Sequence, residues 1–311
     1  MAEKQQKKSK IIVTGGAGFI GSNLVDALLE LGDFEVHVID NLETGKRENI
    51  NPKAVFHEAD IRDYDAIAPF FSGMDYVFHC AALPRIQTAI KDPVPAHHTN
   101  TTGTLNVLRA AQKASAKKLI YSGSSSVYGK NTTPFREDMK PDPLNPYAAQ
   151  KFMGELYCRN FSELYGLPTV ILRYFNVYGP REILEGAYAT VIGIFRQQLK
   201  EGKPMTMVAD GEKKTRDFTH VRDVVRANIL AMESPEVGKA EIINIGTGKN
   251  YTITELADMF GGPIQIIPAR PGETVITLAD NSRAKELLDW EPTISLPEGV
   301  TELKKLHGLL L

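Results

Sequence analysis

TGGAGFIG, residues 14–21, directly follows an apolar run from Lys10 to Thr14 that is typical of a buried strand. Gly15, Gly18 and Gly21 have the spacing of a tight turn between a strand and a helix. Glycine lets the backbone of such a turn approach a pyrophosphate, and the N-terminus of the helix supplies N–H donors and a partial positive charge. The stretch therefore predicts a dinucleotide-binding turn at the start of a parallel α/β sheet.

The first half of the chain continues this alternation of strand and helix. Short β-branched runs predict strands, and stretches with apolar residues at three-to-four spacing predict helices. We predict strands at 10–14, 35–39, 54–58, 76–79, 118–122 and 169–172, and helices at 19–31, 64–71, 100–114 and 147–165. The alternation is typical of βαβ units and predicts a doubly wound parallel Rossmann sheet.

The second half has a looser rhythm of strands and helices and predicts a smaller mixed α/β lobe. We predict helices at 187–201 and 221–232 and a strand at 241–245 that returns to the main sheet. The expected organisation is a flexible tail at 1–9, a Rossmann domain at 10–173 with a return segment near 221–246, and a substrate lobe made mainly of 174–311. Trp290 is expected to pack in this smaller lobe.

Composition excludes several classes of partner. With 36 basic and 38 acidic residues the formal net charge is −2, which gives no reason to expect nucleic acid or an anionic membrane surface. No apolar run approaches a membrane span, and the basic first ten residues lack the apolar region of a signal peptide. Cys80 and Cys158 suit a reducing cytoplasm, and His97 and His98 lack further metal ligands at useful spacing. We expect a cytoplasmic protein without a metal.

Asp40 lies nineteen residues after Gly21, at the end of the second predicted strand. A carboxylate there can accept hydrogen bonds from ribose hydroxyls and would repel a 2′-phosphate, which favours NAD over NADP although basic residues follow closely at 46 and 47. Asp60 and Ile61, after the third strand, are candidates to flank the adenine. The alternative for Asp60 is an ordinary turn carboxylate.

A serine run at 122–129 follows the fifth predicted strand, and Tyr147 and Lys151 stand near a helix start. Residues four apart share one helix face. A free phenol has a pKa near 10, so it acts as a base at neutral pH only if its anion is stabilised by about three pKa units, roughly 4 kcal/mol. A nearby ammonium and an oxidised nicotinamide can supply much of this. Ser124, at the carboxyl end of its strand, can hydrogen-bond the reacting hydroxyl, so we predict that Ser124, Tyr147 and Lys151 are catalytic.

These motifs together closely resemble the extended short-chain dehydrogenase/reductase family, and within it the nucleotide-sugar epimerases. The resemblance covers nearly the whole chain and includes the glycine turn, Asp40, residues 79–82, Asn100 with Gly103, the serine run, Tyr147 with Lys151, the run RYFNVYGPR at 173–181, and residues 216–223. It implies bound NAD, and a homodimer built on helices 100–114 and 147–165. The cofactor contacts it implies are Gly15, Gly18, Phe19, Ile20, Gly21, Asp40, Asn41, Asp60, Ile61, Ala81, Ala82, Asn100, Tyr147, Lys151 and Tyr174.

The residues after Ser124 separate the chemistries of this family. At positions 124–129, sugar 4,6-dehydratases have a motif similar to TDEVYG and UDP-glucuronate decarboxylases one similar to TSEVYG. This chain reads SSSVYG there, with Ser125 and Ser126 in place of the acidic residues. Dehydration needs a further acid and base, which hydroxyls replace poorly. The pattern favours a 4-epimerase. The resemblance implies that Tyr147 takes the 4-hydroxyl proton while C4 passes hydride to NAD, and that the 4-keto sugar is then reduced on its other face.

The same resemblance also implies which residues bind the nucleotide sugar. The two phosphates of a UDP-sugar require cations, and the resemblance points to Arg216 and Arg270. Asn176 is similar to an amide that contacts the phosphates or the sugar. The other implied substrate contacts are Pro84, Ser124, Ser125, Ser126, Tyr147, Ala189 and Thr277.

Sugar selectivity is predicted from one position and two short segments. Residues 186–189 and the Pro84-Arg85 pair resemble UDP-N-acetylglucosamine 4-epimerases. Thr277 stands where epimerases restricted to UDP-glucose commonly have a tyrosine. We predict that the smaller threonine leaves room for an N-acetyl group, so that UDP-glucose, UDP-galactose and their N-acetyl forms are all substrates.

Other functions remain open at this point. The same Ser/Tyr/Lys group also serves nucleotide-sugar dehydrogenases, reductases and dehydratases of the family, and a reductase differs in exchanging its NAD(H) at each turnover. A non-catalytic NAD-sensing scaffold is a further alternative. The intact Ser124, Tyr147 and Lys151 argue against a scaffold, because a sensor has no use for an activated phenol.

Overall fold

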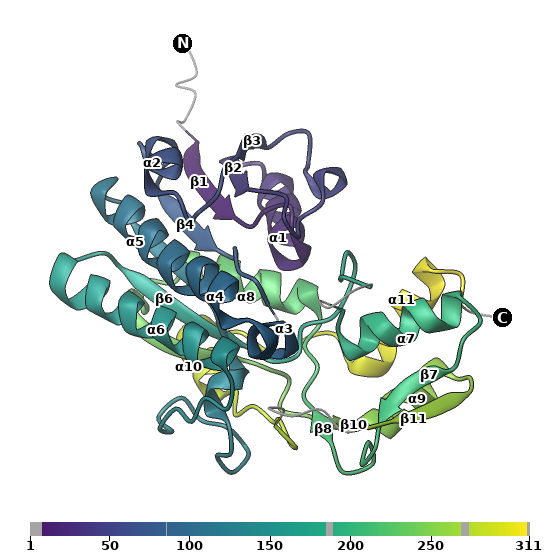
Figure 1. Cartoon of the computed structure of the whole chain (residues 1–311). Coiled ribbons are helices and arrows are strands. Elements are labelled where there is room, and N and C mark those ends of the chain that lie inside the picture. Colours follow the sequence, from purple (N-terminus) through teal and green to yellow (C-terminus); the bar gives the residue numbers. More distant parts are fainter. Residues whose placement is uncertain (1–7, 85, 185–188, 269–273, 310–311) are drawn as a thin grey trace.

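The computed structural model describes residues 8–84, 86–184, 189–268 and 274–309. Its centre is a parallel sheet with the strand order β3-β2-β1-β4-β5-β6-β9 (Figure 1). The order reverses between β1 and β4, which is the point where doubly wound sheets bind ligands. The strands are β1 (Ser9–Thr14), β2 (Phe34–Asp40), β3 (Val55–Glu58), β4 (Tyr76–His79), β5 (Lys118–Ser124), β6 (Thr169–Tyr174) and β9 (Lys239–Ile245).

Helices cover both faces of this sheet because both faces of its strands are apolar. In β1, Ile11 and Val13 belong to one buried cluster, while Ile12 between them belongs to the other. The first cluster is shared with α1 (Phe19–Leu31), α8 (Val221–Glu233) and α10 (Ser282–Leu288). The second is shared with α2 (Tyr64–Ile67), α5 (Thr104–Lys113) and α6 (Pro146–Tyr165), the last two of which lie side by side in Figure 1.

A second lobe with its own apolar core stands beside the sheet (Figure 1). Its main elements are α7 (Val191–Lys200), β7 (Met205–Val208), α9 (Ile253–Phe260), β11 (Ile264–Ile267) and α11 (Leu296–Leu306). Two short strands, β8 (Thr215–Arg216) and β10 (Tyr251–Thr252), pair antiparallel. Within the described ranges, no helix has the length and apolar character that crossing a membrane requires.

Three predicted helices differ in the structure, each for a local reason. The helix predicted at 187–201 begins only at Val191, because the Thr190 hydroxyl caps it by accepting a 3.0 Å hydrogen bond from Gly193 N. The helix predicted at 64–71 ends as α2, and a 3₁₀ turn that contains Pro69 follows. The helix predicted at 100–114 starts as a π-helical turn, η3 (His98–Gly103), before α5. Two short helices, α3 (Ile86–Lys91) and α4 (Pro93–His97), were not predicted.

Trp290 does not pack in the smaller lobe, contrary to the prediction. It is fully buried in the cluster that α1 and α8 share with the sheet. Its indole Nε1 donates a 2.9 Å hydrogen bond to the carbonyl oxygen of Asp223, in the first turn of α8. The segment near 290 therefore crosses back to cover the main sheet, so the two lobes interleave in the sequence.

A buried ion pair joins α6 to β6. The guanidinium of Arg173 donates from Nε and Nη2 to the two carboxylate oxygens of Glu155, over 2.9 and 2.7 Å. The side chains are 1% and 2% exposed, and the guanidinium also lies 4.6 Å from the ring centroid of Tyr128. Removing one member of such a pair leaves a charge in a low-dielectric interior.

We predict that Arg173→Met lowers the free energy of unfolding by about 3–5 kcal/mol, because Glu155 then keeps an uncompensated buried charge. Urea unfolding followed by circular dichroism measures this. The double variant Arg173→Met with Glu155→Leu removes both charges and should regain most of the loss. A single variant within about 1 kcal/mol of the wild type would contradict the prediction.

Candidate active site

The turn between β1 and α1 needs glycine at two positions. Gly15 has φ of +72°, and a Cβ there would lie 2.6 Å from the backbone nitrogen of Ala81. A Cβ on Gly21 would lie 2.2 Å from the carbonyl oxygen of Gly15. Helix α1 starts after Gly18, and its first N–H groups receive no side-chain cap from the part of the chain that the structure describes. This backbone cradle at a helix N-terminus fits the pyrophosphate of a dinucleotide.

Asp40 lies at the end of β2, beside the same turn. Its carboxylate oxygens accept hydrogen bonds from the backbone nitrogens of Ala17 (3.0 Å) and Leu42 (2.8 Å). Burial raises the pKa of Asp40, and the two backbone donors oppose that rise. Asn41 donates from Nδ2 to Asp60 over 2.8 Å. Asp40, Asn41 and Asp60 all line the pocket, and carboxylate oxygens carry further lone pairs that could accept from ribose hydroxyls.

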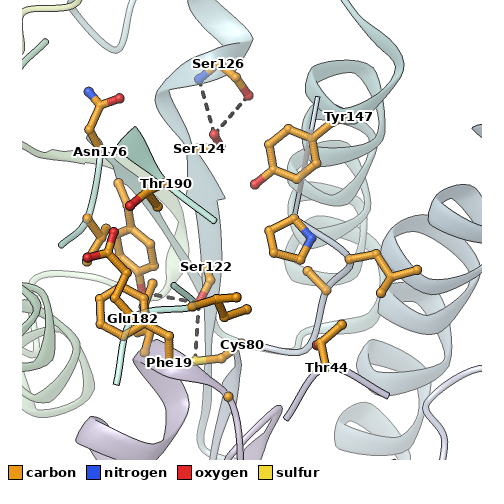
Figure 2. A pocket seen from close by; sticks show the side chains of 18 of the residues that line it. Phe19, Thr44, Cys80, Ser122, Ser124, Ser126, Tyr147, Asn176, Glu182 and Thr190 are labelled. Carbon is orange, nitrogen blue, oxygen red and sulfur yellow. Dashed lines mark hydrogen bonds between the residues drawn. The ribbon is translucent and has the colours of Figure 1, made fainter. Parts of the chain in front are cut away.

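Helix α6 presents Tyr147 and Lys151 to the pocket. Its start is fixed by Pro146 as the first helical residue and by Asn145, whose Oδ1 accepts a 2.9 Å hydrogen bond from Ala148 N. Proline at the first position loses no helical hydrogen bond, and an asparagine cap satisfies one exposed N–H. Tyr147 therefore lies in the first turn, where its hydroxyl reaches out from the helix toward the end of β5 (Figure 2).

Lys151 lies one turn further along and is buried. Its Nζ donates a 2.9 Å hydrogen bond to the carbonyl oxygen of Ser122 and lies 5.1 Å from the ring centroid of Tyr121. Burial lowers the pKa of Lys151 to about 8, so the ammonium form still predominates at neutral pH. A cation held in this apolar surrounding favours an anion in its vicinity. The helix thus places a phenol and an ammonium at one wall of the pocket.

Ser124 is the last residue of β5 and faces Tyr147 across the pocket wall (Figure 2). Its Oγ accepts a 3.2 Å hydrogen bond from the backbone nitrogen of Ser126 and lies 2.9 Å from Ser126 Oγ. The neighbouring Ser125 also lines the pocket. Three hydroxyl side chains therefore stand together opposite the phenol, at a place where the strand ends and a 3₁₀ turn begins.

A chain of polar groups, several of which line the pocket, connects this wall to α8. Ser122 Oγ contacts Cys80 Sγ over 3.4 Å and the hydroxyl of Tyr174 over 3.2 Å. The Tyr174 hydroxyl in turn lies 3.0 Å from Oδ1 and 2.8 Å from Nδ2 of Asn228 on α8. Tyr174 lines the pocket as expected for a cofactor contact, but its hydroxyl is engaged on the far side. The chain fixes the ends of three strands relative to α8.

Asn100 is predicted to contact the cofactor, but the structure places it behind the pocket wall. Its Oδ1 accepts from Leu83 N over 2.8 Å, and its Nδ2 donates over 3.0 Å to both Leu83 O and Gln150 Oε1. These three bonds use both donors of the amide. Asn100 therefore ties the segment after β4 to the catalytic helix. Gln150, which lies next to Lys151 in the sequence, was not predicted to take part.

His79 extends this support to β1. The Thr104 hydroxyl donates its one proton to the carbonyl oxygen of Asn100 over 2.7 Å. It can therefore only accept from His79 Nε2, which lies 2.9 Å away. His79 Nδ1 then accepts from the hydroxyl of Thr14 over 2.7 Å. Burial lowers the pKa of His79 to about 3, which keeps the ring neutral in this arrangement. The only sequence signal for this role was the position of His79 at a strand end.

Asn176 and Thr277 lie at the other end of the pocket and are joined to each other. Nδ2 of Asn176 donates to the carbonyl oxygen of Asp217 (2.7 Å) and to Thr277 Oγ1 (3.0 Å). Thr277 Oγ1 also accepts from the backbone nitrogen of Asp217 over 3.1 Å. Because both amide protons of Asn176 are used, its Oδ1 remains as the group that can meet a ligand. An acceptor suits a sugar hydroxyl better than a phosphate.

The remaining predicted substrate residues separate into two groups. Pro84, Ala189 and Arg216 line the pocket. The guanidinium of Arg216 donates over 2.9 Å to the carbonyl oxygen of Val275. Arg270 lies outside the described residues, as do residue 85 and residues 186–188.

The pocket as a whole has a volume of about 870 Å³ and runs from the glycine turn to the second lobe. Of the predicted site residues that the structure describes, all except Asn100 line it. Among the described residues, no three His, Cys, Asp or Glu side chains come together as a metal site. Sequence reasoning predicted Ala189, Arg216 and Thr277 from the second lobe but missed other lining side chains there, because most of them belong to no motif: Thr190, Ile192, Ile194, Thr206, Val208, Phe218 and Ile253.

Comparison with known proteins identifies relatives over nearly the whole chain. The NAD dependent epimerase/dehydratase family matches residues 11–246. A putative UDP-glucose 4-epimerase of Methanocaldococcus jannaschii is 40% identical, over 93% of this chain and 95% of that protein. The UDP-glucose 4-epimerase of Thermotoga maritima, solved with UDP-glucose, is 38% identical with a TM-score of 0.91, covering 97% of this chain and all of that one.

A third relative handles an N-acetylated sugar. The UDP-N-acetylglucosamine 4-epimerase of Methanobrevibacter ruminantium, solved with UDP-N-acetylmuramic acid, is 36% identical with a TM-score of 0.90. The alignment covers 98% of this chain and all of that one. The alignment therefore spans both lobes.

We predict that Gly21→Ala greatly reduces the NAD that copurifies with the protein, because the new Cβ would collide with the Gly15 carbonyl and open the turn. Nicotinamide released by denaturation, measured enzymatically, gives the occupancy. Gly32→Ala controls for a general loss of stability: Gly32 ends the same helix with φ of +79°, so alanine strains the backbone there, but its Cβ meets nothing within 4 Å and leaves the turn unchanged. Equal occupancy in Gly21→Ala and the wild type would contradict the assignment of the turn.

Proposed function

The chain belongs to the NAD-dependent epimerase/dehydratase family, and from this premise we propose that it is a UDP-sugar 4-epimerase. The observation that carries the proposal is the arrangement of Tyr147, Lys151 and Ser124 around one pocket beside the glycine turn. We propose that it inverts C4 of UDP-glucose and UDP-galactose, and of their N-acetylated forms.

The protein residues divide the proton chemistry between them. Tyr147 removes the proton of the 4-hydroxyl and later returns one to the same oxygen. The Lys151 ammonium, held by the carbonyl of Ser122, favours the phenolate form of Tyr147 through its positive charge and so supports its role as a base. Ser124 hydrogen-bonds the reacting oxygen. The glycine turn and Asp40 would hold NAD, which would supply the hydride acceptor and donor that inversion at C4 requires.

The two serines that follow Ser124 favour inversion at C4 over dehydration. Removal of water from the hexose requires an additional acid and base near the ring, and the pocket there presents the hydroxyls of Ser125 and Ser126. Neither hydroxyl titrates near neutral pH, so neither can exchange protons as a carboxyl does. A 4-epimerase needs no such pair, because it returns both the hydride and the proton.

For the nucleotide end, we propose that Arg216 and Arg270 neutralise the two phosphates. Arg216 lines the pocket at the second lobe, in agreement with this role. Asn176 contributes an acceptor to the sugar hydroxyls through Oδ1, because its two N–H groups are used by Asp217 and Thr277. The 10–173 segment, with the return segment near 221–246, would hold the cofactor, and 174–311 would hold most of the substrate.

We also propose a homodimer through α5 and α6. Helix α6 carries apolar side chains exposed to solvent in the single chain, among them Met153 (40%), Leu164 (72%) and Tyr165 (57%). These exposed apolar groups on one long helix support an interface there. Light scattering in solution gives the mass directly.

The selectivity proposal concerns Thr277, which is buried in the pocket wall and bonded to Asn176. A threonine leaves more space than a tyrosine for an N-acetyl group on the neighbouring sugar carbon. The bond to Asn176 adds a second function, because a replacement without an oxygen acceptor at the same place would release the amide. Size and hydrogen bonding must therefore be tested separately.

We expect the purified protein, without added NAD, to convert UDP-glucose to UDP-galactose and UDP-N-acetylglucosamine to its 4-epimer. Tyr147→Phe should lower kcat by about 10²–10⁴-fold, because no base remains for the 4-hydroxyl. Tyr157→Phe, on the same helix but away from the pocket, is the matched control. Chromatography of the nucleotide sugars measures both. Stoichiometric consumption of NAD(H), or the absence of any 4-epimer from a panel of UDP, GDP, CDP and dTDP sugars, would overturn the proposal.

A second prediction separates the two functions of Thr277. Thr277→Tyr fills the space and should lower kcat/KM for UDP-N-acetylglucosamine by at least about tenfold more than for UDP-glucose. Thr277→Val keeps the size but removes the hydroxyl, and should affect both substrates equally through Asn176. Steady-state kinetics with each sugar give the ratios. Equal losses for both sugars in Thr277→Tyr, or no loss on the acetylated sugar, would refute the role in selectivity.

A further inference from the structure

Two loops border the end of the pocket where the adenosine of NAD is expected. One loop follows β2 and contains Asn41 and Glu43, and the other follows β3 and contains Asp60 and Arg62. Asn41, Glu43 and Asp60 line the pocket, whereas Arg62 is not among the described residues of its lining. Folds of this kind hold the adenosine ribose at the end of the second strand, which places the adenosine beside these loops.

The side chain of Arg62 connects the two loops. Its Nη2 donates over 3.0 Å to Oε2 of Glu43 in the other loop. Its Nε donates to both carboxylate oxygens of Asp60 over 2.9 Å, and Nη2 also donates to Asp60 Oδ2. A second bond joins the loops in the opposite direction, because Nδ2 of Asn41 donates over 2.8 Å to the same Asp60 oxygen. The guanidinium therefore holds one carboxylate from each loop.

Without this cation the two loops would repel each other. The carboxylates of Glu43 and Asp60 converge on the one guanidinium of Arg62. Like charges at this separation oppose each other, while a planar guanidinium binds two carboxylates at once through separate N–H groups. Burial would raise the pKa of Asp60, but the hydrogen bonds from Arg62 and Asn41 outweigh it and lower that pKa. Both carboxylates therefore stay ionised and bound to the bridge.

Each loop is also anchored to the fold away from this contact. On the β3 side, Asn106 of α5 donates from Nδ2 over 3.0 Å to the carbonyl oxygen of Arg62. On the β2 side, the backbone nitrogen of Lys46 donates over 3.0 Å to the carbonyl oxygen of Ala17, in the glycine turn. Glu43 lies before that anchor in its loop. Its bond to Arg62 therefore ties the part of the β2 loop that lines the pocket to a fixed point on the other loop.

We propose that Arg62 is a positioning residue that clasps these two loops around the adenosine end of NAD and so keeps the cofactor bound through turnover. The inference rests on the proposed 4-epimerase function, because a reaction without net redox change uses the same NAD molecule again. Arg62 acts through Glu43 and Asp60, which line the pocket, and not on the reacting atoms.

The test measures the release of NAD from the NAD-loaded protein without any sugar. Dilution into a dehydrogenase that consumes free NAD gives the rate constant of release. Arg62→Met should release NAD about threefold to tenfold faster than the wild type, as expected for an exposed network of charges rather than a single pair. Its kcat for epimerisation at saturating NAD should stay within about twofold of the wild type, which a general loss of structure would not allow.

Lys10→Met is the matched control. Lys10 and Glu35 form an ion pair at the opposite end of β1 and β2, with side chains 33% and 41% exposed, against 36% and 40% for Arg62 and Glu43. Removing this pair should leave the rate of NAD release unchanged. Equal acceleration by Lys10→Met and Arg62→Met would overturn the inference, because the effect would then not depend on the two loops.

A double variant shows whether Arg62 acts through Glu43. Glu43→Ala removes the bridge between the loops but leaves Arg62 on Asp60, and it should also speed release. Adding Arg62→Met should then change the rate by less than about twofold. Multiplied effects, or wild-type release from Arg62→Met, would overturn the inference.

The clasp and the proposed function fail in different ways, because release is measured without sugar. A wild-type protein that retains NAD but epimerises no UDP-sugar overturns the proposed function. A working epimerase in which Arg62→Met retains NAD as the wild type does overturns only the clasp.

Discussion

The contact between Gly21 and the carbonyl of Gly15 is the constraint on which the rest of the site depends. It brings α1 so close to the end of β1 that no side chain fits between them. The same approach sets the first helix against the sheet and leaves its N-terminus facing the edge where β1, β2, β4, β5 and β6 all end. Because parallel strands share one carboxyl edge, residues that are far apart in the sequence meet there.

Buried polar groups keep this edge rigid. One chain of hydrogen bonds links Thr14, His79, Thr104 and Asn100, and Asn100 continues it to Gln150 on the catalytic helix. An unpaired polar group in this interior would cost about 1–3 kcal/mol, so each member fixes the orientation of the next. The π-helical turn at 98–103 contains Asn100, and such turns frequently occur at functional sites. The pocket wall is thus held from behind by residues that do not line it.

Sequence reasoning predicted most of the main sheet and the candidate catalytic group, because both depend on local patterns. Strand runs, the glycine spacing and the Tyr-Lys pair are each visible within a few residues. The sequence could not show features that long-range packing decides. Asn100 belongs to the expected motif, but its amide binds Leu83 and Gln150, fifty residues away in the latter case. Trp290 packs against the main sheet because the chain crosses back, which no periodicity near it could indicate.

The hydrogen bond that joins Thr277 to Asn176 also depends on long-range packing, although the sequence predicted both residues as substrate contacts. Asn176 and Thr277 are 101 residues apart, and the hydrogen bond between them exists only because the segment after β6 meets the segment after residue 274 at the rim of the pocket. Asp217 holds both, through its backbone carbonyl and its backbone nitrogen. Its carboxylate, in turn, accepts from the backbone at Thr247, Gly248 and Ala279. Selectivity built in this way depends on the junction of four chain segments. A single substitution at Thr277 therefore changes the space for the sugar and the orientation of the amide together, which is why size alone does not describe that position.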